Sequence, residues 1–270
     1  MTSGEVANGA APGTSARALL AVEGVTVRFG GVTALDDVRF EVGTRQICGL
    51  IGPNGAGKTT LFNCISRLYE PSVGDIAFEG RPLSRVPRCE IARLGIARTF
   101  QNLALFSTMT VRQNVRVGAH AFASGGFFAE ALALPPARRA EREIAGLADS
   151  LIEECRLQGV ADRLVGELPF GVRKRVELAR ALAISPKLLL LDEPAAGLNH
   201  EEVDALATEI VSLRERRSLS VLLVEHHMNL VMRVSDQVVA LDFGRLIANG
   251  TPAAVRAHPE VIRAYLGSAA

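Results

Sequence analysis

The segment LIGPNGAGKTTLF (residues 50–62) constrains the fold more than any other part of the sequence. Its spacing, G-x-x-x-x-G-K-T, begins at Gly52 and ends with Lys58 and Thr59. The apolar run QICGLIG at 46–52 predicts a buried parallel strand before it, and the residues after the glycines predict a helix. Glycines between a strand and a helix let backbone N–H groups close around a phosphate. The segment therefore predicts a phosphate-binding loop in an α/β protein.

The residue types in this loop suit nucleotide chemistry. Only Lys58, Lys174 and Lys187 are lysines among the 30 basic residues, so composition does not explain a lysine at this position. Lys58 is a flexible point charge that can reach the β- and γ-phosphates, and Thr59 offers a hydroxyl to Mg²⁺. The predicted phosphate-binding set is Gly52, Pro53, Asn54, Gly55, Ala56, Gly57, Lys58, Thr59 and Thr60. A loop of this kind alone leaves kinase, GTPase and ATPase activity open.

Composition excludes several classes of protein. The 270 residues are 48% hydrophobic and carry a net charge of +1, which gives no sign of bulk binding to nucleic acid or anionic membranes. The four cysteines are far apart, so we expect buried small residues in a reducing compartment rather than disulfides or a zinc site. No apolar run reaches the roughly 18 residues of a membrane span. Residues 1–17 lack the pattern of a signal peptide and predict a disordered tail.

The rest of the chain predicts an α/β core with two additions. Residues 19–29 and 36–42 alternate in polarity and predict an antiparallel hairpin. From about residue 87 to 163 the periodicity is helical, which predicts a mainly helical insertion. Strand and helix patterns alternate again from residue 187 onward, which favours a parallel sheet.

The segment LLLLDEP (188–194) carries a second set of candidate residues. Its leucines predict a buried strand that places Asp192 at the carboxyl end, where ligands bind in open α/β sheets. Asp192 can hold Mg²⁺ through water, and Glu193 can polarise an attacking water, which is worth roughly 10²–10⁴-fold in rate. His226 follows another buried strand and can contact the γ-phosphate and hold the attacking water. If that strand continues, His227 points elsewhere.

The order and spacing of these motifs resemble those of ATP-binding cassette (ABC) ATPases over nearly the whole chain. The resemblance assigns residues 52–59 to the Walker A motif and residues 188–193 to the Walker B motif. It implies that Phe29 stacks on adenine. It also implies that Gln101, in RTFQN, is the Q-loop glutamine that contacts Mg²⁺ and senses the γ-phosphate. His226 corresponds to the switch histidine of the family.

The segment LPFGVRKRVELARAL (168–182) resembles the family signature but departs from its usual Leu-Ser-Gly-Gly-Gln. The family's serine hydroxyl donates to the γ-phosphate across a dimer interface, and Pro169 cannot do that. Gly171 and the following helix N-terminus still offer backbone N–H groups. Either backbone donors alone suffice at this half-site, or the half-site is weak.

Subfamily features, such as LLVEHHMNLVM and NGTPAAVRAHPEVIRAYLG, resemble the larger ATPase subunit of branched-chain amino-acid importers. The resemblance implies a P-loop NTPase core with a mostly parallel sheet, an N-terminal antiparallel β subdomain and an inserted helical subdomain. The ABC ATPase domain would span 18–267 after the tail 1–17, with the helical subdomain at about 87–183.

The same resemblance implies ATP and Mg²⁺ as cofactors and a peripheral position at the cytoplasmic face of the membrane. The expected partners are a second ABC ATPase subunit, related or identical, in a head-to-tail dimer and two transmembrane permease subunits. A solute-binding protein would act indirectly, and no nucleic acid is expected.

The sequence lacks features that other nucleotide-binding proteins carry. Soluble ABC ATPases of DNA repair or translation usually carry long coiled coils or tandem cassettes. A GTPase would carry Asn-Lys-x-Asp, and a small-molecule kinase needs an acceptor site and a lid. A scaffold that binds nucleotide without hydrolysis would not need Glu193 and His226. The transported solute stays open, because close relatives serve urea or short amides and the solute never touches this chain.

Overall fold

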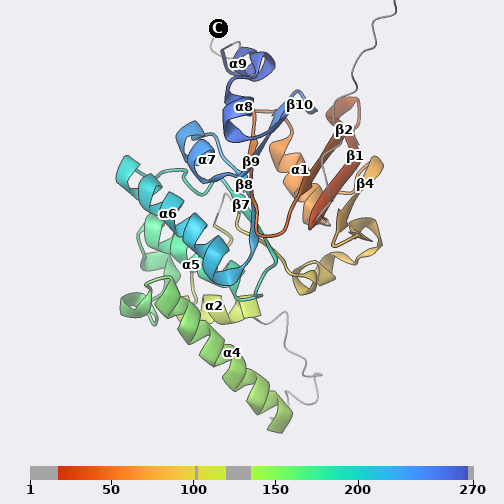
Figure 1. Cartoon of the computed structure of the whole chain (residues 1–270). Helices are drawn as coiled ribbons and strands as arrows, with labels where there is room; N and C mark the ends of the chain where they lie inside the picture. Colours follow the sequence, from red (N-terminus) through yellow and green to blue (C-terminus); the bar gives the residue numbers. More distant parts are fainter. Residues whose placement is uncertain (1–17, 101–102, 120–134, 267–270) are drawn as a thin grey trace, which may run out of the picture.

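The computed structural model describes residues 18–100, 103–119 and 135–266 (Figure 1). Within these residues, helix α1 (Lys58–Ile65) lies between a small antiparallel sheet and a larger, mainly parallel sheet. Other helices cover the opposite face of the larger sheet. This arrangement confirms the predicted α/β class with a parallel core.

The larger sheet has the strand order β10-β9-β3-β8-β7-β6. Strands β9, β3, β8, β7 and β6 run parallel, and β10 pairs antiparallel with β9. The bounds of these strands are Ile47–Ile51 (β3), Ile96–Arg98 (β6), Leu188–Asp192 (β7), Ser220–Val224 (β8), Gln237–Asp242 (β9) and Arg245–Gly250 (β10).

The smaller sheet has the order β2-β1-β4-β5, and its pairs are antiparallel. This confirms the hairpin predicted near the start of the chain. The bounds of its strands are Leu20–Phe29 (β1), Val32–Val42 (β2), Val73–Phe78 (β4) and Arg81–Pro82 (β5).

Helices other than α1 form two groups in Figure 1. Helices α5, α6 and α7 lie on the face of the larger sheet opposite α1, with α2 and the long α4 beyond α5. Helices α8 and α9 close the other end near β10. The bounds are Val111–Ala119 (α2), Pro135–Glu154 (α4), Phe170–Leu182 (α5), His200–Arg217 (α6), Met228–Val234 (α7), Pro252–Arg256 (α8) and Pro259–Leu266 (α9).

The central strands are buried on both faces, which is why they are continuous apolar runs. Every residue of β3, β7 and β8 is buried. Because side chains alternate along a strand, Leu189 and Leu191 pack among the helices α5 to α7 while Leu188 and Leu190 pack toward α1. Two hydrophobic cores therefore meet at one sheet, and the carboxyl ends of its strands are held at a common edge.

One strand lies inside the range that the sequence predicted to be helical. β6 (Ile96–Arg98) pairs parallel with β7 as an edge strand of the larger sheet. The prediction missed it because three residues are too few to show a period of two. The predicted tail 1–17, Gln101 and the stretch 120–134 lie outside the described residues.

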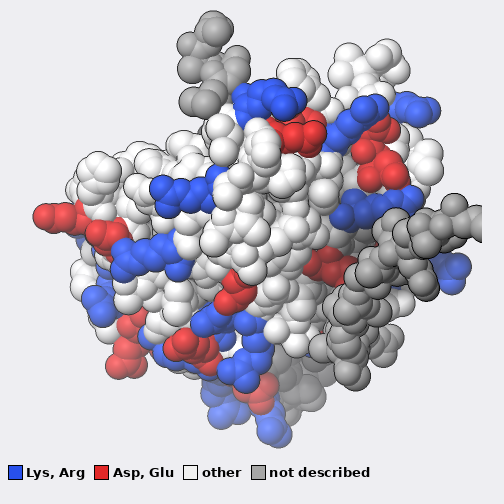
Figure 2. All heavy atoms as spheres, turned by 45° about the horizontal axis from the view of Figure 1, so that its top comes forward, with Lys and Arg blue, Asp and Glu red and all other residues white. Residues whose placement is uncertain are grey.

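The described residues bear on the expectations for cysteine burial, membrane spans and surface charge. Cys48, Cys64 and Cys155 are buried as expected, whereas Cys89 is exposed, so the expectation was wrong for that residue. Among the residues the structure describes, no helix combines the length and apolar character of a membrane span. On the face drawn in Figure 2, basic and acidic side chains are interspersed.

Candidate functional site

The phosphate loop, defined here as residues 52–57, lies between β3 and α1. Gly57 has a φ of 99°, and a Cβ at this position would meet the carbonyl oxygen of Ala34 at 2.6 Å. The N–H of Gly244 donates to the carbonyl of Ala56 at 3.2 Å, so the turn after β9 also braces the loop. The sequence requires glycine at Gly57 because both the backbone conformation and the contact with β2 exclude a side chain.

Helix α1 begins without a side-chain cap, because its N-cap residue is Gly57. The first turn contains Lys58, Thr59 and Thr60, and Thr59 is exposed. Uncapped N–H groups and the helix dipole favour an anion at this end. The start of α1 thus has the donors that a phosphate needs, and Thr59 supplies an exposed hydroxyl oxygen beside them.

Lys58 folds back over the phosphate loop. Its Nζ donates to the carbonyls of Gly52 at 2.6 Å and Pro53 at 2.8 Å. Burial lowers the pKa of Lys58, and the charges of Glu193 and Asp192 act in the opposite direction. The charges of both predicted acids therefore act on Lys58.

The loop is also held from the C-terminal helix, a contact that the sequence did not suggest. The N–H of Gly52 donates to the hydroxyl of Tyr265 in α9 at 2.8 Å. Burial raises the pKa of Tyr265, and the hydrogen bond from Gly52 acts against that rise. The two residues are 213 positions apart in the chain, so no local pattern indicates the contact.

Asp192 ends β7 with its side chain 5% exposed. Its Oδ2 accepts a hydrogen bond from Arg98, at the end of β6, at 2.8 Å. Sequence reasoning missed Arg98, because β6 itself was missed. A carboxylate ion pair at the carboxyl edge of the sheet fits the predicted position for Asp192 and adds a basic residue to it.

Glu193 stands immediately after β7 in a strained backbone conformation. Its φ is 47°, in the left-handed region that non-glycine residues rarely adopt. Its N–H donates to the carbonyl of Val224 at 2.9 Å, which ties the turn to the end of β8. Backbone strain of this kind concentrates at functional sites, and here it falls on the predicted general base.

His226 and His227 lie together after β8. The strand ends at Val224, so His226 follows it as predicted. The strand does not continue to His227, which precedes α7 as its N-cap. The two ring centroids are 4.8 Å apart. Glu225, which is fully buried, accepts from the N–H groups of both histidines.

Glu225 is a third residue that the sequence reasoning missed, after Tyr265 and Arg98. Its Oε1 accepts from the N–H of Ala195 at 2.6 Å. Through Oε2 it holds the backbone of His226 and His227. One buried carboxylate therefore joins the turn after β8 to the turn after β7. The apolar strand before it gave no sign of this, since an acid at a strand end is commonly exposed.

The other predicted nucleotide contacts lie on separate elements. Phe29 is 47% exposed and packs edge-on against Tyr69 with ring centroids 5.1 Å apart. Tyr69, which is 40% exposed, was not predicted. Gly171 lies in the first turn of α5, whose N-cap is Pro169 and carries no side-chain cap. Gln101 lies outside the described residues.

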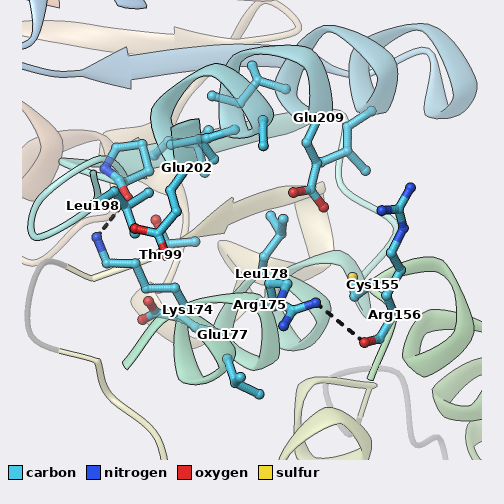
Figure 3. Close-up of a pocket in the computed structure, with 18 of the residues that line it drawn as sticks. Thr99, Cys155, Arg156, Lys174, Arg175, Glu177, Leu178, Leu198, Glu202 and Glu209 are labelled. Atoms are coloured by element: carbon cyan, nitrogen blue, oxygen red, sulfur yellow. Dashed lines mark hydrogen bonds between the residues drawn. The ribbon is translucent and has the colours of Figure 1, made fainter. Parts of the chain in front are cut away.

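A cleft of about 780 Å³ joins several of these elements. Its lining includes Gly171 at the start of α5 and the acids Asp192 and Glu193. Figure 3 shows Lys174 and Glu177 of α5 facing Glu202 of α6 across it. Lys174 Nζ donates to the carbonyls of Pro194 and Ala196, and this fastens α5 to the turn after Glu193.

Comparison with known proteins identifies the family. The family model described as ABC transporter matches residues 35–196, which include the phosphate loop, the two acids and the start of α5. The chain belongs to the ABC transporter family. A second model, described as branched-chain amino acid ATP-binding cassette transporter, matches residues 245–270.

Relatives of this ABC subunit match along almost their whole length. BraF of Pseudomonas aeruginosa, a high-affinity branched-chain amino acid transport ATP-binding protein, is 44% identical over 253 residues, 94% of this chain and 99% of BraF. LivG of Salmonella typhimurium, named for the same transport, is 45% identical over 251 residues, 93% of this chain and 98% of LivG. The ADP conformation of MJ1267, an ATP-binding cassette of an ABC transporter, superposes with a TM-score of 0.80 at 29% identity, covering 93% of this chain and 99% of MJ1267.

Family membership confirms two predictions. This ABC subunit has the ABC ATPase fold, and it is an ATP-binding ATPase coupled to transport. The kinase, GTPase and non-transport alternatives are thereby set aside.

Proposed function

We propose that this chain is the ATP-hydrolysing subunit of an importer for branched-chain amino acids. The observation that carries the solute class is the match of residues 245–270 to a model described for such transporters, together with BraF and LivG, which are named for that transport. LptB of Haemophilus influenzae, an ATP-binding protein of lipopolysaccharide export, is also similar but at 34% identity over 249 residues. The higher identity favours import of amino acids over export of a lipid.

The site fits ATP and Mg²⁺ on the chemistry of its donors. The uncapped start of α1 and Lys58 would hold the phosphates, and the exposed rings of Phe29 and Tyr69 would hold the base. Thr59 and Asp192 provide oxygen ligands of the kind that Mg²⁺ prefers. When bound, Mg²⁺ would neutralise charge on the phosphate oxygens.

The chain's own residues supply the proton chemistry in this proposal. Glu193 would take a proton from the attacking water at its carboxylate, and His226 would hold that water in line. Glu225 would keep these two in register, because it binds the backbone of Ala195 and of His226. Gln101 would report the state of the γ-phosphate to the helical subdomain.

The uncapped start of α5 supports the proposed assembly. Gly171 and its neighbours would face the ATP held by a second ABC ATPase subunit, head to tail, and the second subunit would do the same in return. Two permease subunits would receive the motion at the cytoplasmic face of the membrane, and a solute-binding protein would deliver the amino acid. The helical subdomain, at about 87–183 within the domain 18–267, would carry that motion.

Uptake by cells tests the proposal. A strain of the source organism carrying Glu193→Gln at the native locus would be given labelled leucine, with urea and a short amide in parallel. We expect leucine uptake to be lost while the other two are unchanged. Loss of urea or amide uptake with normal leucine uptake would overturn the solute class, and unchanged uptake of all three would overturn the transport role.

A further inference from the structure

Arg98 connects the two elements that carry the proposed Mg²⁺ ligands. Its guanidinium donates to Asp192 Oδ2 at 2.8 Å and to Asn63 Oδ1 at 2.7 Å. Asp192 ends β7, whereas Asn63 lies in α1 four residues after Thr59 and so on nearly the same helix face. One side chain therefore links the strand end of Asp192 to the helix of Thr59.

The guanidinium of Arg98 is closely confined. The Arg98 side chain is 8% exposed, and its Cζ lies 5.5 Å from the ring centroid of Phe62 and 5.1 Å from that of Phe100. Ser66 Oγ is a further acceptor at 3.3 Å. A planar guanidinium can fork between acceptors and stack on aromatic rings at the same time, and a lysine ammonium cannot.

Stability alone is a weak explanation for this ion pair. Removing two charges from water is costly, and apolar replacements of buried ion pairs are often as stable or more stable. The Nε of Arg98 is buried and has no hydrogen-bond partner among the described residues. Asp192 and Asn63 therefore each accept a hydrogen bond from Arg98, while one donor of Arg98 stays without an acceptor.

We propose that Arg98 is a positioning residue for the Mg²⁺ site, an inference that rests on the ATP-hydrolysing function proposed above. By holding Oδ2, Arg98 fixes the rotamer of Asp192 and leaves Oδ1 as the oxygen available to the hydration shell of the metal. By holding Asn63, it fixes the spacing between Asp192 and the helix that carries Thr59.

The main rival explanation is electrostatic and makes a different prediction. If Arg98 only set the local charge, a lysine would serve equally well. Arg98→Lys keeps the charge but cannot contact Asp192, Asn63 and both rings together. Asn63→Ala keeps the Arg98–Asp192 ion pair and removes only the link to α1.

Binding of a fluorescent ATP analogue, mant-ATP, to the purified chain separates these explanations. Its Kd would be measured with EDTA and with excess Mg²⁺, and the Kd in EDTA divided by the Kd in Mg²⁺ reports the contribution of the metal. Since loss of a residue that orients a metal ligand costs 10- to 100-fold in metal affinity, we expect Arg98→Lys to lower this ratio by about tenfold. We expect Asn63→Ala to lower it less, and the Kd in EDTA to stay within about twofold for both.

The matched control is Arg214→Lys. Arg214 also pairs with an aspartate, Asp236. Oδ2 of Asp236 accepts from the N–H of Ile47, at the amino-terminal end of β3 and away from the carboxyl ends of the strands. We expect wild-type behaviour from this variant. An unchanged ratio in both Arg98→Lys and Asn63→Ala would overturn the inference, as would an equal loss of affinity in Mg²⁺ and in EDTA.

Two further outcomes have distinct meanings. If Arg98→Lys fails to fold by circular dichroism, the Asn63→Ala ratio alone decides, and an unchanged value rejects the positioning role. If the wild-type chain does not bind mant-ATP in Mg²⁺, the proposed function itself fails, which differs from a loss confined to the variants.

Discussion

Helices α1 and α5 both begin without a side-chain cap, yet their surroundings differ. At the start of α1, the charges of Glu193 and Asp192 raise the pKa of Lys58 and so oppose the effect of its burial. At the start of α5, the N-cap is Pro169, and the exposed ring of Phe170 lies 5.0 Å from Lys174 Nζ.

The starts of α1 and α5 offer different groups to a bound nucleotide. The end at α1 combines backbone donors with a cation, two acids and a hydroxyl. At the α5 end, Lys174 is already bound to the carbonyls of Pro194 and Ala196. The start of α5 therefore offers uncapped backbone N–H groups. In the assembly proposed above, the α5 end of one subunit would complete the site at the α1 end of another.

Among the next four variants, we expect His226→Ala to have the largest effect, and that effect is on the rate of ATP hydrolysis. Loss of the residue that holds the attacking water should lower the rate of ATP hydrolysis by about 10²-fold, with ATP affinity little changed. The matched control is His227→Ala, because its ring lies 4.8 Å from that of His226 and it shares the same backbone support from Glu225. Equal rate losses in both variants would contradict the assignment of His226.

Lys58→Ala tests the charge at the α1 end. A hydrogen bond to a charged group is worth about 1.5–3 kcal/mol, so ATP affinity should fall by about ten- to a hundredfold. Isothermal titration calorimetry measures this directly. Lys187→Ala is the control, since Lys187 forms an exposed ion pair with Glu79 and should have no effect on binding. Wild-type ATP affinity in Lys58→Ala would contradict a role for the Lys58 charge in phosphate binding.

Tyr265→Phe tests the support of the phosphate loop from α9. The substitution leaves the N–H of Gly52 without its acceptor, and we expect a loss of about 1–3 kcal/mol in the free energy of unfolding. Urea denaturation measures it. Tyr69→Phe is the control, because among the described residues no hydrogen bond involves the hydroxyl of Tyr69 and its ring contact with Phe29 would remain. Similar losses in both variants would show that Tyr265 is not specifically required.

Val172→Gln tests the α5 end and should have the smallest effect. The substitution restores one side chain of the usual family signature. If backbone N–H groups suffice there, the rate of ATP hydrolysis should stay within about twofold. The rate would be measured with Val172→Ala alongside. A gain far beyond twofold in Val172→Gln alone would show that the half-site is impaired in the wild type.

The fold was predictable wherever the pattern was long. Continuous apolar runs gave β3, β7 and β8, because burial on both faces leaves a simple signal. The three residues of β6 gave none. His226 follows β8 as predicted, but no sequence pattern indicated α7, which begins directly after His227.

The site was predictable where a single motif carries it, as at Lys58, and not where distant residues meet. Arg98 and Asp192 are 94 positions apart, and Tyr265 and Gly52 are 213 apart. Such contacts depend on the packing of β6 beside β7 and of α9 beside the phosphate loop, which no local sequence pattern specifies.

A paired measurement on Glu193→Gln tests most directly whether Glu193 is the general base of ATP hydrolysis. ATP binding and single-turnover hydrolysis would be followed on the same preparation of wild type and variant, each with the partner subunits. The account predicts wild-type ATP affinity in the variant and a hydrolysis rate lower by about 10²–10⁴-fold, since only the general base is lost. A near-native rate would contradict the role of Glu193 and with it the claim that the acids beside α1 carry the chemistry.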